Sequence, residues 1–134
     1  PTRYSASRKK MILFTESYIR AGHKAKPDII VALHVYLHPS KQHAVKLARP
    51  YFERTLLFHQ EYRRPGSKIP DFDNVNKERL AVFSSPERAA EIFRDYEAIG
   101  VTHVICMVNF GGAPMADVRR TMELISQELM PRMP

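Results

Sequence analysis

Two histidines and a tyrosine alternate along one strongly apolar segment, residues 29–38. β-branched and aromatic residues dominate this segment and Pro39 follows it, so the pattern predicts a β-strand. Alternation along a strand places His34, Tyr36 and His38 on one face, which is apolar enough to bury and polar enough to bind a ligand. A metal ion would need a third ligand, and no matched carboxylate lies nearby, so we expect no metal site.

A second buried strand is predicted over residues 101–110, directly before a pair of glycines. Its more polar face consists of His103, Ile105, Met107 and Asn109. Alternation alone does not decide which face points inward, and Asn109 either contacts a ligand or caps the turn. Gly111 and Gly112 precede a helix start, where backbone N–H groups can receive an anion, but a simple turn is the expected role. Cys106 has no activating base beside it and is expected to pack as a small apolar residue.

Helices must position these two strands, and the sequence indicates where each helix begins and ends. Periodic apolar residues predict helices over residues 8–21, 41–62, 86–99 and 114–130. Pro50 is expected to kink or split the second of these. Between them, residues 63–79 carry prolines, a glycine and no helical or strand period, which predicts one long loop. Alternating strands and helices are typical of a parallel sheet. Two main strands cannot complete such a sheet, so we expect a segment that other strands complete.

Composition excludes several classes of protein. The 134 residues suffice for one domain, and 44% hydrophobic with 26% charged residues is typical of a globular chain. The net charge of +7 is scattered rather than gathered in a stripe, so we expect no nucleic-acid partner. The single cysteine excludes an internal disulfide, and no apolar run approaches ~20 residues. We therefore expect a cytoplasmic protein without a membrane partner.

The segment from Phe83 to Met133 resembles the C-terminal end of the bacterial luciferase-like, flavin-dependent monooxygenases. The resemblance rests on the order of four features: a helix start at Ser84-Ser85-Pro86-Glu87, the strand 101–110, the turn Gly111-Gly112, and the ending Glu128-Leu129-Met130-Pro131. Ser84 departs from the glycine that the family usually has there. The strand 29–38 and its flanking helices fit the same pattern more loosely.

The resemblance implies a fold and a place within it. The family folds as a (β/α)8 TIM barrel, which needs about 250 residues. Residues 1–134 would then be a single C-terminal segment of the barrel domain, incomplete by itself. This segment would supply the sixth helix of the barrel, its seventh strand and helix, and its eighth strand and helix. Residues 63–79 would form a lid at the active-site rim, with Arg63, Arg64 and Lys68 screening a flavin phosphate or an acidic substrate.

The resemblance also implies an activity. The parent protein would be an oxidoreductase that uses reduced FMN and O2 to oxygenate a small organic substrate, with the FMN supplied by a separate flavin reductase. Some relatives use the deazaflavin F420 instead. The pocket would be lined by His34, Tyr36, His38, Met107, Asn109, Gly111 and Gly112, with the catalytic residues unknown. The opposing interpretation is a non-catalytic subunit that acts by association, either as a homo-oligomer or with the missing barrel segment. On either interpretation, the 134 residues alone are expected to be inactive.

Overall fold

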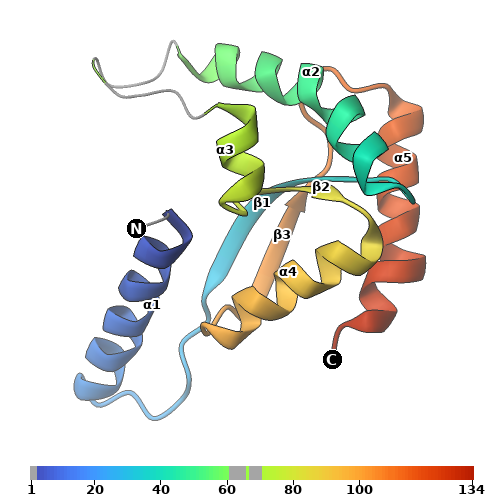
Figure 1. The fold of residues 1–134 in the computed structure, drawn as a ribbon. Coiled ribbons are helices and arrows are strands. Elements are labelled where there is room, and N and C mark those ends of the chain that lie inside the picture. The colour runs from blue at the N-terminus through green and yellow to red at the C-terminus, as the bar shows by residue number, and fades with distance from the viewer. Residues whose placement is uncertain (1–2, 61–65, 67–70) are drawn as a thin grey trace.

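The computed structural model describes residues 3–60, 66 and 71–134, and forms three parallel strands with helices on both sides (Figure 1). The α-helices are α1 (Arg3–Arg20), α2 (Lys41–Gln60), α3 (Phe72–Lys77), α4 (Pro86–Ala98) and α5 (Met115–Leu124). The strands are β1 (Ile30–Leu37), β2 (Ala81–Ser84) and β3 (His103–Met107). A π-helical turn (Ile125–Leu129) and a 3-10 turn (Met130–Arg132) extend α5. The two predicted strands and the predicted helices are thus confirmed, with ends that differ by a few residues.

β1 is the central strand, and its two halves have different neighbours. Its first half pairs with β3, from Ile30 opposite His103 to His34 opposite Met107. Its second half pairs with β2, from His34 opposite Ala81 to Leu37 opposite Ser84. Both pairings are parallel, and the sheet order is β2-β1-β3.

This strand order corrects the expectation of a barrel segment. In a (β/α)8 barrel the strands pair in the order in which they follow one another along the chain. Here β2 and β3 both follow β1 in the chain but pair with its two opposite edges. The C-terminal portion of a TIM barrel is therefore the wrong fold class. The described residues form a small α/β domain with a three-stranded parallel sheet and five α-helices.

The long loop expected over residues 63–79 is also corrected, because part of it is helix α3. The side chain of Asp71 caps this helix by accepting a hydrogen bond from the backbone N–H of Asn74 at 2.8 Å. Arg63, Arg64 and Lys68 lie outside the described residues, so their role in a lid stays a prediction. Pro50 does not split the preceding helix, because α2 runs through it to Gln60.

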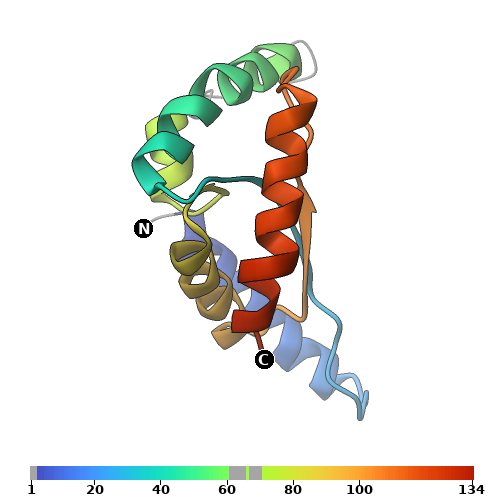
Figure 2. The same cartoon turned by 90° about the vertical axis from the view of Figure 1, so that its right-hand side faces the viewer.

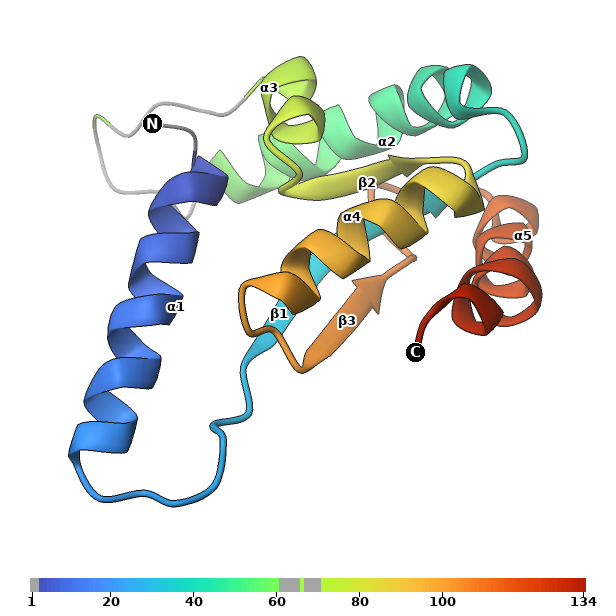
Figure 3. The same ribbon diagram turned by 60° about the horizontal axis from the view of Figure 1, so that its bottom comes forward.

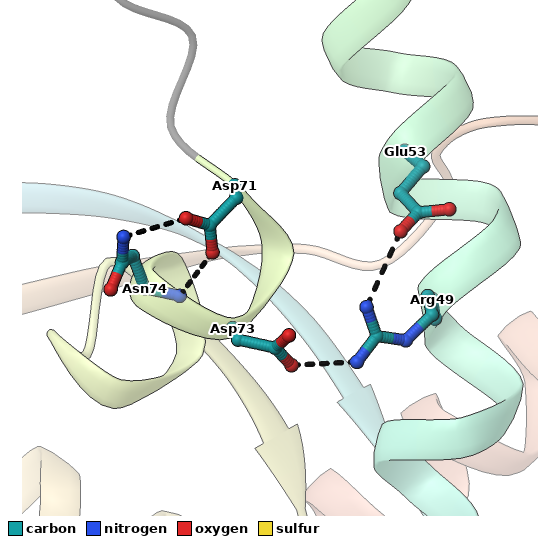
Figure 4. Close-up of polar contacts among 5 residues, drawn as sticks. All are labelled: Arg49, Glu53, Asp71, Asp73 and Asn74. Atoms are coloured by element: carbon teal, nitrogen blue, oxygen red, sulfur yellow. Dashed lines mark hydrogen bonds and ion pairs between the residues drawn. The ribbon is translucent and has the colours of Figure 1, made fainter.

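Helix α3 is attached to α2 by a group of charged side chains (Figure 4). Arg49 on α2 donates to Asp73 on α3 at 2.6 Å and to Glu53 on its own helix at 3.4 Å. The Arg49 guanidinium also lies 4.4 Å from the centre of the Phe72 ring. These contacts hold α3 over the same face of the sheet as α2.

Each face of the sheet has its own apolar core. On one face, Leu33, Val35 and Leu37 pack with α4 and with the end of the C-terminal helix. Figures 2 and 3 show these two helices beside the sheet. The buried residues of α4 include Ala89, Ile92, Phe93 and Tyr96, which confirms its predicted core face. On the other face, α2 and α3 cover an aromatic core: Tyr36, Phe52, Phe72, Phe83 and Phe110.

The inward stripe of the last helix differs from the expected one at one position. Val118 and Leu129 are buried as predicted, but Met122 is 56% exposed and Thr121 is fully buried instead. The Thr121 hydroxyl accepts a hydrogen bond from the backbone N–H of Leu37 at 3.1 Å. β3 ends opposite His34 and does not reach Leu37. The Thr121 side chain therefore gives the N–H of Leu37 the hydrogen-bond partner that a neighbouring strand would otherwise provide.

Candidate functional site

The candidate site lies beside the second half of β1, where β3 ends at Met107 opposite His34. β1 continues into α2, which covers the aromatic face, whereas the helix after β3 leads toward the α4 face, where Leu124, Ile125 and Leu129 pack. Neighbouring parallel strands whose connections leave in opposite directions open a crevice at their carboxyl ends. Open α/β sheets bind ligands at such crevices.

A cavity of about 410 Å³ opens at this crevice, between α2 and the segment that follows β3. It is lined by His34, Arg54, Thr55, Phe58, His59, Asn109, Phe110, Gly111 and Gly112. The structure thus brings together four residues that the sequence singled out: His34, Asn109, Gly111 and Gly112. Arg54, Thr55, Phe58 and His59 were missed, although spacings of one and four residues place them on one face of a helix.

His34 forms the floor of the cavity, where aromatic rings surround it. Its ring meets Phe52 edge-on at 5.2 Å and Phe110 edge-on at 5.1 Å. Burial lowers the pKa of His34 below its ordinary value of 6.5, and the neighbouring His59 lowers it further. The imidazole is therefore neutral at pH 7, with one ring nitrogen that donates and one that accepts.

The two glycines let the turn after β3 pack directly against α2. Both have positive φ, and a Cβ on Gly111 would lie 1.8 Å from the carbonyl oxygen of Tyr51. Nη1 of Arg54 donates to the carbonyl oxygen of Gly111 at 2.7 Å, and a Cβ on Gly112 would approach the same nitrogen to 2.9 Å. The glycine pair therefore closes the cavity wall, and its use for anion binding stays a prediction.

Tyr36 points away from the cavity and joins β1 to α5. Its hydroxyl donates to Oδ2 of Asp117 at 2.5 Å and accepts from Nη2 of Arg120 at 2.8 Å. Burial raises the pKa of Tyr36 well above its ordinary range, and the hydrogen bond to Asp117 raises it further. Tyr36 is thus held as a neutral phenol, which suits a structural link between the two elements.

His38 and Met107 also lie outside the lining of the cavity. Nδ1 of His38 accepts a hydrogen bond from the backbone N–H of Ser40 at 3.0 Å, so the ring helps to start α2. Burial lowers the pKa of His38, and Arg120 and His43 lower it further. Met107 is half-buried and stands in register with His34 on the neighbouring strand. Of the seven predicted pocket residues, the structure therefore gathers four and separates three.

A second cavity of about 660 Å³ opens on the other face of the sheet. Apolar side chains of α4, β3 and the C-terminal helix form most of its wall, and Cys106 lies among them. Burial raises the pKa of the Cys106 thiol, which disfavours a thiolate nucleophile. Among residues 3–60, 66 and 71–134, no three His, Cys, Asp or Glu side chains gather as a metal site. None of the described helices has the length and apolar character needed to cross a membrane.

Comparison with solved structures finds the same fold in an enzyme. The crystal structure of monooxygenase RslO1 from Streptomyces bottropensis superposes with a TM-score of 0.77 and 23% sequence identity. The match covers 96% of this chain and 38% of that chain. No family model matches this chain, and neither does any curated protein. The chain therefore has a monooxygenase-like fold over almost its whole length and spans about two fifths of the enzyme that it matches.

Proposed function

We propose that this chain is part of a flavin-dependent monooxygenase, which uses reduced FMN and O2 to oxygenate an organic substrate. The observation that carries the proposal is the cavity beside β1 and the carboxyl end of β3, in a fold shared with a monooxygenase over 96% of the chain. Parallel sheets place ligands at this edge. The other segments of the enzyme would supply the rest of the pocket.

The residues around the cavity fit a flavin by the chemistry of their donors. The amide of Asn109 both donates and accepts, as the polar edge of a flavin ring does. Phe58 and Phe110 supply apolar ring surfaces. Reduced flavin, when bound, would supply two electrons and two protons, so that one oxygen atom of O2 goes to the substrate and the other leaves as water.

This chain's own residues would orient the reactants and keep water out. The rings of Phe52 and Phe110 lie edge-on to His34 and would restrict the access of water to it. Neutral His34 accepts a proton at its free ring nitrogen, and Asn109 orients the ligand at the rim. A flavin reductase would deliver the reduced FMN, and the deazaflavin F420 is the alternative cofactor.

Flavin binding tests this proposal. Two samples are compared: the protein purified from its source cells, called the natural protein below, and the 134-residue chain. Each sample is titrated with oxidised FMN and, in a second experiment under nitrogen, with reduced FMN. We expect quenching of FMN fluorescence at micromolar concentration with the natural protein and no micromolar binding to the 134-residue chain. The re-oxidation of bound reduced FMN on mixing with O2 should differ in rate from that of free FMN, because the pocket controls access to the flavin.

Two substitutions in the natural protein locate the site. Asn109→Ala and His34→Gln should each weaken FMN binding or slow oxygenation at least about tenfold. His103→Gln is the matched control, because His103 is exposed on β3 and lies outside the cavity lining. A natural protein that binds neither FMN nor F420 would overturn the proposal, and so would equal effects of all three substitutions.

A second candidate function, association without catalysis, has one observation in its favour. Among the described residues, β3 pairs only with β1, so its other edge offers backbone groups to a further strand. Ile105 on β3 is also 53% exposed. Light scattering of the 134-residue chain tests this candidate: a stable oligomer supports it, and a monomer at about 0.1 mM contradicts it.

A further inference from the structure

We infer that the cavity between α2 and residues 109–112 binds a planar aromatic anion, such as an aromatic carboxylate or a phenolate, and that Arg54 recognises its negative charge. The inference deepens the proposed function, because it names the substrate class of the same site. Its test measures binding alone, so it can fail or succeed separately from flavin chemistry.

The first step is the charge of the cavity wall. Among the residues that the structure describes, its side chains include one guanidinium and two imidazoles, those of Arg54, His34 and His59, and no carboxylate. A pocket with cationic and N–H donor groups and no acidic group favours an anionic ligand over a neutral or cationic one. The amide of Asn109 adds a further donor at the rim.

The second step is the state of Arg54, which differs from that of Arg49 on the same helix. Arg49 contacts two carboxylates, Asp73 and Glu53. Arg54 forms no ion pair with any described carboxylate, and its hydrogen bond goes to the carbonyl oxygen of Gly111. That bond uses one of five N–H donors and fixes the plane of the guanidinium. The remaining donors suit the two oxygens of a carboxylate or the single oxygen of a phenolate.

The third step is the shape of the remaining wall, which is aromatic. Phe58 and Phe110 line the cavity, and the ring of His34 lies edge-on to Phe110 at 5.1 Å. Flat ring faces of this kind pack best against a planar ring system. A volume of about 410 Å³ accommodates two or three fused rings, within the usual range for small-molecule sites.

The experiment compares a charged probe with its neutral counterpart. 2-Naphthoate and naphthalene-2-carboxamide have nearly the same shape, and only the first is an anion at pH 7. Each is titrated against the 134-residue chain and the natural protein, and histidine and arginine side-chain NMR signals are followed. We expect naphthoate to bind with a Kd of about 1 mM or tighter, and the carboxamide at least about tenfold more weakly.

Variants on one helix assign the charge recognition. Arg54→Gln should remove the preference for naphthoate over the carboxamide, and Arg54→Lys should restore part of it, because lysine keeps the charge and loses the planar fork. Lys46→Gln is the matched control, because it removes one exposed positive charge from α2 away from the cavity. Thermal unfolding shows whether each variant is folded and whether loss of the hydrogen bond to Gly111 lowers its stability. A folded Arg54→Gln protein that keeps the preference would overturn the inference.

Competition with inorganic phosphate distinguishes the two anions that this site could bind, the phosphate of a flavin and an aromatic substrate. If inorganic phosphate displaces naphthoate at equal concentration, the cavity is a phosphate subsite for the flavin, and the aromatic substrate class is wrong. If naphthoate binds and phosphate at 10 mM does not displace it, the inference stands. Failure of the natural protein to bind FMN, with naphthoate binding intact, would overturn the proposed function alone.

Discussion

The hydroxyl of Tyr36 on β1 lies 2.5 Å from Oδ2 of Asp117 on α5, 81 residues later in the chain. The same hydroxyl accepts a hydrogen bond from Arg120, one turn further along α5. Since Tyr36 is 1% exposed, this contact fixes the last helix against the carboxyl end of the central strand. The cavity depends on it indirectly, because the segment 109–114 that forms one wall ends at the start of α5.

The first prediction concerns this link. Tyr36→Phe should lower the free energy of unfolding by about 2 kcal/mol, because a hydroxyl bonded to two charged groups is lost and both are left without their buried partner. Urea denaturation measures the change. Tyr51→Phe is the control, because Tyr51 stacks on Tyr36 and its hydroxyl has no hydrogen bond in the described structure. Equal losses in the two variants would contradict the role given to the Tyr36 hydroxyl.

The sequence predicted the faces of the strands well, because alternation follows directly from backbone geometry. Leu33, Val35 and Leu37 lie in one core, and Tyr36 lies in the other, as the two-faced strand required. Strand order, by contrast, depends on which edge a short segment joins. β2 has only four residues, and nothing in its sequence distinguishes one edge of β1 from the other. The barrel expectation came from the family resemblance, and the strand order contradicts it.

The site was predicted in part for a similar reason. His34 was found because it shares one face of a recognisable strand with Tyr36 and His38, and Asn109 because it lies at the end of a strand beside the glycine pair. Arg54 and His59 come from the middle and end of a long helix, and only tertiary packing shows which face of α2 meets the turn at Gly111. Tyr36 was expected in the pocket because it shares the face of His34, but its side chain is long enough to reach α5 instead.

The second prediction concerns the close approach of the turn to α2. Gly111→Ala should cost at least about 3 kcal/mol of stability, because the new methyl group would lie 1.8 Å from the backbone oxygen of Tyr51 and the backbone has positive φ. Gly22→Ala is the matched control: its φ is +91°, but nothing lies within 4 Å. It should cost only the conformational strain, about 1–2 kcal/mol. Thermal unfolding compares the two.

The third prediction concerns the attachment of α3. Arg49→Ala removes the contacts with Asp73, Glu53 and the Phe72 ring together. The global stability should fall by only about 1 kcal/mol, because the ion pairs are exposed. Amide hydrogen exchange within α3 should nevertheless rise more than in β1, because α3 has few other attachments to α2. Lys46→Ala, on the same helix, should leave exchange in α3 unchanged.

The fourth prediction concerns Cys106, whose thiol pKa is raised by burial. Iodoacetamide at pH 8 should alkylate it about tenfold more slowly in the folded protein than in the chain unfolded by urea, because the thiolate is the reacting form. Mass spectrometry of the intact chain follows the reaction. Equal rates in the folded and unfolded chain would show that the cavity around Cys106 is open to solvent and reagent.

The last prediction follows from the lowered pKa of His34. In the unfolded chain His34 takes up a proton as the pH falls through about 6.5, whereas in the folded protein burial and His59 oppose that uptake until a lower pH. The unfolded state therefore binds more protons in the interval between the two pKa values, and stability must decrease as the pH falls through it. Above that interval His34 is neutral in both states and contributes no pH dependence.

Urea denaturation at pH values between 8 and 5 measures this effect. His34→Gln should flatten the loss of stability below pH 6.5, because the titrating group is gone, whatever the substitution costs at pH 8. His59→Gln should flatten it partly, since His59 is the smaller of the two causes of the lowered pKa. A His34→Gln slope equal to the parent's would mean that the imidazole is hydrated, and that the floor of the cavity is open to water.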